Sequence, residues 1–546
     1  MTFSSKNSKI IFLLLAILAG CVLLYPFIDF QYYLSQGDHG RDLYAFEQTT
    51  HGAKVYQDYW WVYGPLMPVY YSWFDHWLGI NIQSILIGEM FLHLCSGLFI
   101  FLTLCVFFSP LAGLSAAVWF WVFNDDFFFT YNHAGGITML TLIVYALFLY
   151  LKNPRTGYLV LGLVGIFLLS LIKLNFGLSA LLVFVLALGL IDSLNKIPFS
   201  SQKKYVYLAS LALPILILII YSTALKGLSI NEIRQCLPYL KGDQPHETSM
   251  WTAAKSYLSS LWQNMTTAWV NFIFAFLLIL SILQSFFLLF RNKDKKISRN
   301  DRGLILAILV LFLCANAHEY LMSGVSAFYR SYWMRPFQVL TMFTFMAMAT
   351  ENLSRFIKGL LFTTILLSAF LNFQTQVQSI NRIKIPRQYL SHPKAKIFVG
   401  NSPQWIETVN QTTQYLSTHL KNQETFLALP YDCLYYYLTG KTSPTRQLIF
   451  FEHIKIPPQQ ERKVIQDLEN KHVDWIVLSS CSVSSEHGLG VLGKTYCPIL
   501  GKYLEDNFSV VATFGDWKNP PGWAWNHGTK ILRREELNDD RYKQKN

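Results

Sequence analysis

The first 373 residues alternate long apolar blocks with short polar segments. A membrane-spanning helix needs about 20 predominantly apolar residues in succession. The blocks that approach or exceed this length are Ile10–Ile28 and residues 82–108, 111–129, 136–151, 158–172, 178–192, 205–225, 267–290, 303–322, 337–350 and 356–373. The pattern therefore predicts about 11 transmembrane helices. The blocks 158–172 and 178–192 are short, so a tilted, distorted or re-entrant course is open for both.

From about residue 374 onward, the apolar runs shorten to the length of β-strands. These runs are Phe426–Leu429, Trp475–Leu478, Phe508–Phe514 and Lys530–Leu532. Helix-like stretches lie between them, such as Pro458–Lys471, where apolar residues recur at helical spacing. Alternating strands and helices predict a small soluble α/β domain over residues 374–546.

The composition also indicates a membrane protein. Hydrophobic residues make up 52% of the 546 residues and charged residues only 14%, whereas soluble domains carry about 25% charged residues. A net charge of +12 can indicate a nucleic-acid partner, but here the basic residues cluster at the ends of apolar blocks. Basic residues on the cytoplasmic side set membrane orientation. We therefore expect a lipid bilayer, and no nucleic acid, as a partner.

The distribution of charge between loops predicts the orientation. With a cytoplasmic N-terminus, the cytoplasmic junctions hold the basic residues Lys152, Arg155, Lys196, Lys203, Lys204, Arg291, Lys293, Lys295, Lys296, Arg299, Arg302, Arg355 and Lys358. The first outside loop, residues 29–81, has six acidic residues against two basic ones, as the positive-inside rule requires. An odd number of spans then places residues 374–546 outside, where a disulfide can form. Among Cys433, Cys481 and Cys497, the pair we expect is Cys481–Cys497.

The sequence contains none of the common motifs for nucleotide binding or zinc hydrolysis. It lacks a phosphate-binding glycine loop, a dinucleotide fingerprint and a GxSxG elbow, and His318-Glu319 has no second His at zincin spacing. The segment richest in polar and aromatic residues is instead Gly37–Tyr71, in the first outside loop. Asp38 and Asp42 lie four residues apart and share one face if this stretch is helical.

Aromatic residues in the same loop suggest contact with the membrane. Leu43, Tyr44 and Phe46 would give the helix that carries Asp38 an apolar side, which we expect to lie against the bilayer. The run Tyr59–Tyr63 is rich in Trp and Tyr, which are enriched at membrane interfaces. The alternative is an interfacial loop whose acidic residues are only solvated.

The order of residues in this loop carries a family resemblance. Asp38 follows the first span closely, and after it come Leu43-Tyr44-Ala45, Gly52, Val55-Tyr56-Gln57-Asp58 and Gly64-Pro65-Leu66. This order resembles the acidic pair, L-Y-x-A, Gly, P-Y-x-D and G-P-L of polyprenyl-phosphate-sugar-dependent glycosyltransferases of the GT-C superfamily. The nearest group comprises bacterial relatives of protein O-mannosyltransferases and of lipid A aminoarabinose transferases. The chain departs from the pattern at His39, where many relatives have Glu, and at Val55, which is often Pro.

Two further features extend the resemblance over most of the chain. Lys173-Leu174-Asn175-Phe176-Gly177 resembles the K-Q-N-x-G stretch between two short spans of that family. The architecture is similar too, with about 11 spans, a large first outside loop and an outside C-terminal domain. The resemblance implies a bacterial inner-membrane protein with an all-α GT-C-type module at 1–373, whose first periplasmic loop at 29–81 carries the catalytic acid. A periplasmic α/β domain at 374–546 follows.

The resemblance also implies a reaction and roles for individual residues. Such enzymes are inverting glycosyltransferases that move a hexosyl or pentosyl group from undecaprenyl phosphate to an envelope glycan, lipid or protein. Asp38 matches the first-loop acid, which implies a general base, although an Asp here could also cap a helix. The cations implied for the leaving phosphate are Lys173, Arg330 and Arg335. Candidates for acceptor contacts or secondary roles are His39, Asp42, Asp58 and His133.

The sequence does not decide whether a divalent metal ion takes part. Carboxylate and imidazole groups suit several divalent ions, and no spacing in the chain requires a site. The possible ligands, which come from different loops, are Asp38, His39, Asp42, His133 and His318.

Two other functions remain as alternatives. A transporter or flippase of lipid-linked sugars would tend to show inverted repeats and intramembrane charges, but the halves show no convincing repeat. Within the predicted spans, Glu89 and His93 are the main polar pair, and we interpret them as packing residues. An O-antigen polymerase or ligase usually carries its large functional loop late in the chain, whereas the acidic loop here comes early.

Overall fold

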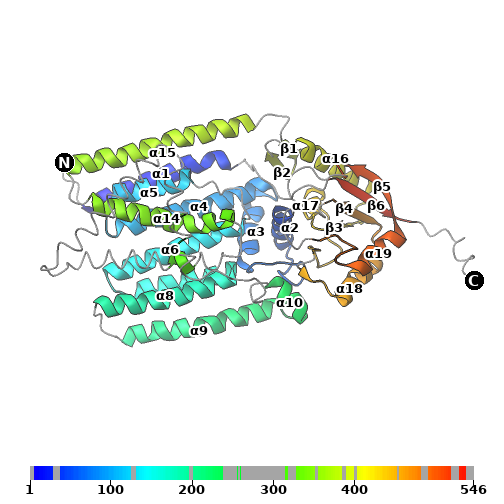
Figure 1. The fold of residues 1–546 in the computed structure, drawn as a ribbon, viewed down its shortest axis with the longest axis horizontal. Coiled ribbons are helices and arrows are strands. Elements are labelled where there is room, and N and C mark those ends of the chain that lie inside the picture. The colour runs from blue at the N-terminus through cyan, green and yellow to red at the C-terminus, as the bar shows by residue number, and fades with distance from the viewer. Residues whose placement is uncertain are drawn as a thin grey trace, which may run out of the picture.

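The computed structural model has a bundle of long helices at one end and a smaller α/β unit at the other (Figure 1). The residues it describes are 5–28, 37–123, 131–195, 201–237, 255, 259, 314–317, 327–350, 354–383, 389–398, 403–451, 454–480, 490–517 and 528–535. Two short helices, α2 and α3, lie between the bundle and the α/β unit (Figure 1).

Most of the described residues of the bundle belong to long apolar helices. These are α1 (Ser5–Leu24), α4 (Ile82–Cys105), α5 (Pro110–Val122), α6 (Asn132–Lys152), α7 (Thr156–Ile172), α8 (Leu174–Asn195), α9 (Ser201–Ala224), α14 (Ala327–Ala349) and α15 (Arg355–Ile383), with a 3-10 turn at Tyr25–Phe27. In the described residues, 6 helices are long and apolar enough to cross a membrane: α1 with the turn after it, α4, α6, α8, α9 and α15. The chain is thus a multi-pass membrane protein.

The helices agree with the apolar pattern wherever the two can be compared. Nine of the predicted blocks coincide with α1, α4–α9, α14 and α15. The block 267–290 and most of 303–322 lie outside the described residues, so the total of about 11 spans stays a prediction. The block predicted at 178–192 is longer than expected, because α8 already begins at Leu174.

The outer helices of the bundle expose apolar side chains, as lipid-facing helices do. On α9, Leu211 and Leu218 are 74% and 68% exposed. By contrast, α6 is mostly buried among the other helices. An apolar surface of this kind is stable in hydrocarbon, whereas water would disfavour it. The first turn of α6, with Asn132 and His133, and Lys173 between α7 and α8 are also buried.

Helix α2 (Asp38–Thr50) is covered by protein and not by lipid. Leu43, Tyr44 and Phe46 are fully buried. The Phe46 ring stacks on Tyr71 of α3 at 4.6 Å, and the Tyr44 ring lies 5.3 Å from Tyr436. The expectation that these residues lie against the bilayer was therefore wrong, because α3 and the C-terminal unit occupy that face.

Helix α3 (Leu66–Leu78), which packs against α2, has one exposed apolar face. Val69, Trp73 and Trp77 follow one another at intervals of four residues and are 48%, 70% and 78% exposed. Met67 and Tyr71, on the opposite face, are buried. Two exposed Trp on a helix next to the spans suit the membrane interface.

The C-terminal unit is built on a mixed four-stranded sheet with strand order β3-β4-β6-β5. Its strands are β3 (Phe426–Leu429), β4 (Trp475–Ser479), β5 (Phe508–Phe514) and β6 (Thr529–Arg534), with helices α16 (Pro403–His419), α17 (Leu434–Thr439), α18 (Pro458–Asn470) and α19 (Pro498–Asn507). A separate hairpin pairs β1 (Tyr389–His392) with β2 (Ala395–Phe398). Strands β3 and β4 are parallel and the other pairs antiparallel. The predicted α/β character of this region is thereby confirmed.

Polar contacts attach the C-terminal unit to the first loop. Lys394 of the β1–β2 hairpin lies 2.5 Å from Glu47 of α2. Arg446 lies 2.9 Å from Glu232 of helix α10 (Ile230–Cys236), and its guanidinium also donates to the Tyr56 carbonyl.

The cysteine Cys497 is a free, buried thiol, and its expected partner Cys481 lies outside the described residues.

Candidate functional site

The first turns of α2 carry a compact group of charged side chains. Asp38 and Asp42 lie on one face, as their spacing predicts, and Arg41 lies between them. The Arg41 guanidinium donates to Asp42 Oδ1 at 2.9 and 2.7 Å and to Asp38 Oδ1 at 3.1 Å. Charge-assisted bonds of this kind are about twice as strong as neutral ones. One cation thus organises both acidic residues.

The two acidic side chains differ in their access to solvent. About a third (34%) of the Asp38 side chain is exposed, and none of the Asp42 side chain. Asp42 Oδ2 also accepts from the Asn132 amide at 3.0 Å. Burial raises the pKa of Asp42 to about 7, although Arg41 opposes the shift. Asp38 is therefore the acid that solvent can reach, whereas Asp42 is enclosed by protein.

A tyrosine of the C-terminal unit completes this group. The Tyr431 hydroxyl donates to Asp38 Oδ1 at 2.8 Å and accepts from Arg41 at 2.8 Å. Gly40 allows the close approach, because a Cβ there would lie 2.5 Å from the backbone nitrogen of Leu434. The start of α17 therefore packs directly against α2.

Aromatic rings connect Arg41 to a second buried cation. The Arg41 guanidinium lies 5.4 Å from the Trp61 ring centre and 5.2 Å from that of Tyr63. The centre of the same Tyr63 ring lies 5.8 Å from Lys173 Nζ. Cations within about 6 Å of an aromatic ring are attracted to its face. Tyr63 is thus the side chain shared by the two cationic centres.

The backbone holds Tyr63 in this position. The N–H of Gly64 donates to the Ile172 carbonyl at the end of α7, at 2.8 Å. A Cβ at position 64 would lie 2.0 Å from the Leu171 carbonyl oxygen, so no side chain fits there. The Gly of the G-P-L motif is therefore explained by contact between the first loop and α7.

Lys173 lies in the junction between α7 and α8, as the sequence predicts, and it is buried. Its Nζ lies 4.8 Å from the Phe176 ring centre and 5.5 Å from that of Trp333. Burial lowers the pKa of Lys173 to about 7. An anion placed beside a buried amine stabilises the charged form of the amine, which burial disfavours.

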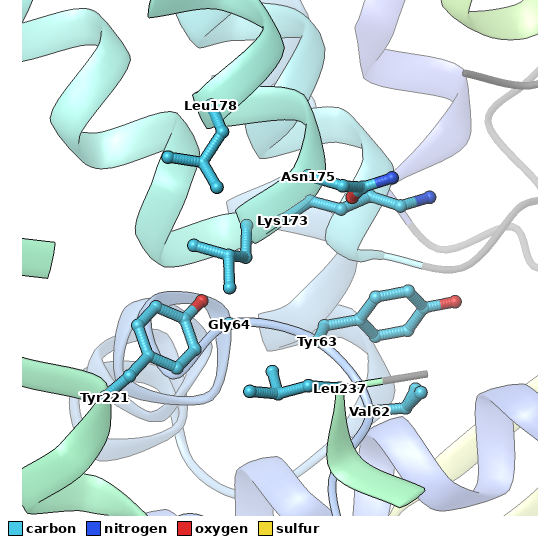
Figure 2. Close-up of a pocket in the computed structure, with 9 residues that line it drawn as sticks. Val62, Tyr63, Gly64, Lys173, Asn175, Leu178, Tyr221 and Leu237 are labelled. Carbon is cyan, nitrogen blue, oxygen red and sulfur yellow. The ribbon is translucent and has the colours of Figure 1, made fainter. Parts of the chain in front are cut away.

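A cavity opens beside Lys173. Its volume is about 160 Å³, and its lining is Val62, Tyr63, Gly64, Lys173, Leu174, Asn175, Leu178, Tyr221 and Leu237. Figure 2 shows the polar ends of Lys173 and Asn175 side by side above the Tyr63 ring, with Leu178 and Tyr221 on the other side. The lining is thus mainly apolar, with its cationic group at one end.

The remaining candidates differ in how close they lie to this centre. His133, at the start of α6, accepts at Nδ1 from Trp333 at 2.9 Å, and its ring lies 6.2 Å from Tyr63. His39 is buried, edge-on to the Tyr131 ring at 5.3 Å. Asp58 is exposed, and it accepts from the backbone N–H of Lys54 at 2.6 Å, so it closes a turn.

Arg330 and Arg335 belong to a helix and not to a loop. Both were expected in the loop before the span at 337–350, but α14 already begins at Ala327. The residues of the segment have no helix-breaking Gly, and its one Pro is tolerated at Pro336. The side chain of Arg330 lies outside the described residues, and Arg335 is half-buried.

Three side chains of the centre were not predicted from the sequence. Arg41 was counted only as a charge of the loop, and neither Tyr431 nor Trp333 was selected. Arg41 follows Asp38 by three positions and precedes Asp42 directly, so helical spacing could have indicated it. Tyr431 and Trp333 come from distant segments, and their role depends on tertiary contacts.

The described residues do not fit a resident metal ion. They contain no group of three or more His, Cys, Asp and Glu side chains that could hold one. Asp42, the best-buried carboxylate of the centre, is already bonded to Arg41 and Asn132. His318 lies outside the described residues.

Comparisons with known proteins identify the fold. No protein-family model and no curated protein sequence matches the chain. The crystal structure of ArnT from Cupriavidus metallidurans bound to undecaprenyl phosphate has a TM-score of 0.55 and 10% identity, and covers 98% of this chain and 99% of that one. The apo structure of the same protein has a TM-score of 0.53 and 10% identity, with 96% and 98% covered. An oligosaccharyltransferase from Archaeoglobus fulgidus has a TM-score of 0.49 and 11% identity, with 86% and 68% covered.

The two ArnT structures establish similarity to GT-C glycosyltransferases over nearly the whole chain. The fold is therefore GT-C-like, with a mostly helical membrane module and a small mixed sheet. A shared fold does not by itself fix the activity. The activity has to be argued from the centre around Asp38, Arg41 and Lys173.

Proposed function

We propose that this protein is an inverting glycosyltransferase that moves a sugar from a polyprenyl phosphate carrier to an acceptor of the cell envelope. The observation that carries the proposal is that a partly exposed acid, Asp38, is connected through Arg41 and the Tyr63 ring to a buried cation, Lys173. An acid for the acceptor and a cation for the leaving phosphate are the two groups the reaction needs. The ArnT of the similar structure is bound to undecaprenyl phosphate, and we extend that carrier class to this chain.

The cavity beside Lys173 suits the carrier. Its lining combines a buried cation with apolar side chains, which matches a phosphate attached to an isoprenoid. The low pKa of Lys173 follows from burial, so a phosphate bound there would draw a proton onto the amine and then pair with it. Arg41, 5.2 Å from the centre of the Tyr63 ring, adds a second positive charge.

The centre supports a direct displacement. The acceptor hydroxyl oxygen attacks the anomeric carbon, and Asp38 takes the hydroxyl proton. The bond between the anomeric carbon and the phosphate oxygen breaks, and its electron pair stays on that oxygen. Polyprenyl phosphate then leaves with one more negative charge, while Asp38 has become neutral. Lys173 and Arg41 stabilise the charge that develops on the phosphate.

The orientation follows from the same proposal. Helix α2, which begins at Asp38, lies between the bundle and the C-terminal unit (Figure 1). We place residues 29–81 and the domain 374–546 in the periplasm of a bacterial inner membrane, with residues 1–373 forming the membrane module and the N-terminus in the cytoplasm. The acceptor would then be an envelope glycan, lipid or protein, and the candidates Arg330 and Arg335 would lie on the same side.

A transfer assay tests the proposal. The purified full chain is incubated with a panel of radiolabelled polyprenyl-phosphate sugars and envelope extract, and label in the acceptor is counted. We expect transfer from at least one donor, and a loss of about 100-fold or more in Asp38→Asn, since general base catalysis is worth about 10²–10⁴-fold. Asp506→Asn, on the exposed face of α19, is the matched control and should transfer as the wild type does. Transfer by D38N at the wild-type rate would remove Asp38 from the mechanism.

A further inference from the structure

The hydroxyl of Tyr431 has its hydrogen-bond directions fixed by its neighbours. A guanidinium can only donate, so Arg41 must give a hydrogen to the Tyr431 oxygen, 2.8 Å away. The single phenolic hydrogen is then directed to Asp38 Oδ1, also at 2.8 Å. Tyr431 is buried, and its ring stands edge-on to Phe451 at 5.4 Å. The hydroxyl is therefore held as a donor to the carboxylate.

The donor comes from a different part of the chain than the acid. Tyr431 follows the end of β3 by two residues, in the C-terminal unit, whereas Asp38 begins α2 in the first loop. Strand β3 is parallel to β4, and ligand sites commonly lie beyond the carboxyl ends of parallel strands. The close approach of Leu434 to Gly40 fixes the distance between the two units at this point.

We propose that Tyr431 is a positioning residue for Asp38, through which the C-terminal unit sets the orientation of the general base. This rests on the proposed glycosyltransferase function. With Oδ1 held by Tyr431 and Arg41, the exposed third of the Asp38 side chain stays available to the acceptor.

The variant that tests the proposal is Tyr431→Phe, which keeps the ring against Phe451 and removes only the hydroxyl. A hydrogen bond to a charged group is worth about a tenfold change or more. We expect kcat to fall about tenfold or more, because the carboxylate loses the contact that orients it. The KM for the donor should change by no more than about twofold, because Tyr431 is not part of the lining of the cavity beside Lys173.

The matched control is Tyr435→Phe. Tyr435 is buried in α17 of the same unit, and its hydroxyl lies 3.1 Å from Thr529 Oγ1, in the sheet. This variant loses a buried tyrosine hydroxyl as well, so it reproduces any general effect on stability. Its kcat and its KM should match those of the wild type. If Tyr431 had a merely structural role, kcat in Y431F would not fall beyond the change in Y435F.

A second measurement does not depend on sugar transfer. Hydrogen exchange with mass spectrometry reports how firmly the start of α2, which carries Asp38, is held. Amides of this turn should exchange about tenfold faster or more in Y431F and at the wild-type rate in Y435F.

The outcomes separate this proposal from the function it rests on. If the wild type transfers sugar while Y431F keeps the wild-type kcat and the wild-type exchange at the start of α2, the positioning role is refuted and the transferase proposal stands. If no donor is used at all, the transferase proposal fails, and the exchange at the start of α2 alone decides whether Tyr431 holds Asp38 in place. Unchanged exchange there refutes that role in either case.

Discussion

Replacing Arg41 by Met tests whether one buried cation organises α2. The Arg41 guanidinium makes four hydrogen bonds, two to Asp42 and one each to Asp38 and Tyr431. Removing one partner of a buried ion pair destabilises a protein by about 3–5 kcal/mol, since the other charge is left without compensation. Because the lost contacts belong to α2, we expect the effect in the local opening of that helix.

The size of the effect should depend on pH. The pKa of Asp42 is raised by burial from 3.8 to about 7, so folded wild type loses stability as pH rises to about 7 and no further. Without Arg41 the pKa of Asp42 would rise further, so the variant continues to lose about 1.4 kcal/mol for each pH unit above 7. The destabilisation caused by R41M should therefore grow by about 2 kcal/mol between pH 6 and pH 8.5.

Hydrogen exchange with mass spectrometry measures this opening in the full-length protein in detergent. Amides in α2 should exchange about 100-fold faster or more in R41M at pH 8.5, after correction for intrinsic rates. The double variant R41M/D42N should lose the pH dependence. Arg534→Met breaks a partly exposed ion pair with Glu469 and should change local opening by no more than about 1 kcal/mol. A change in α2 below about fivefold, or an equal change at both pH values, would refute the reasoning.

Three other features of the structure lead to predictions. Because the amine of Lys173 has a pKa lowered to about 7, a bound phosphate must draw a proton onto it above that pH, so the KM for the donor should rise with pH above about 7 in the wild type. In Lys173→Met, the KM should be about tenfold higher at pH 6.5 and should not depend on pH in this way. A KM equal to that of the wild type would contradict a phosphate site beside Lys173. Burial raises the pKa of Asp432 from 3.8 to about 8, and no described side chain bonds its carboxylate oxygens, so the wild type loses stability as pH rises from about 4 to 8. Differential scanning fluorimetry should therefore show a larger gain in Tm for Asp432→Asn at pH 8 than at pH 6. Equal gains at the two pH values would contradict this. The exposed face of α3 should contact lipid, so a lipid that carries a photoreactive group below its headgroup should crosslink to peptides containing Trp73 and Trp77, and absence of these crosslinks would place α3 in water.

Patterns along the sequence predicted most elements of the fold. The runs Phe426–Leu429 and Phe508–Phe514 are strands with the same bounds, because short apolar segments between polar turns have few alternatives. The long apolar blocks are helices, because segments of that length and composition also have few alternatives. The start of α8 was placed four residues late, because the polar Asn175 interrupts the apolar pattern without interrupting the helix.

The contents of the site could be predicted only in part. Asp38, Asp42 and Lys173 were selected, because an acid after a span and a charge between two spans stand out along the chain. Periodicity gives α2 an apolar side but does not say what covers it, so the contact with the C-terminal unit was not foreseen. Arg41 and Tyr431 act through contacts between segments almost 400 residues apart in sequence, which no local pattern contains.

The fate of the carrier lipid tests the central claim most directly. Proteoliposomes with a labelled polyprenyl-phosphate sugar are incubated with envelope acceptor, and the lipid fraction is analysed by mass spectrometry. The proposed transferase predicts that sugar-free polyprenyl phosphate accumulates, one molecule for each sugar that appears on the acceptor, and that D38N forms neither product. Carrier that crosses the bilayer with its sugar still attached, at equal rates in both proteins, would contradict the account and indicate transport of the lipid-linked sugar instead.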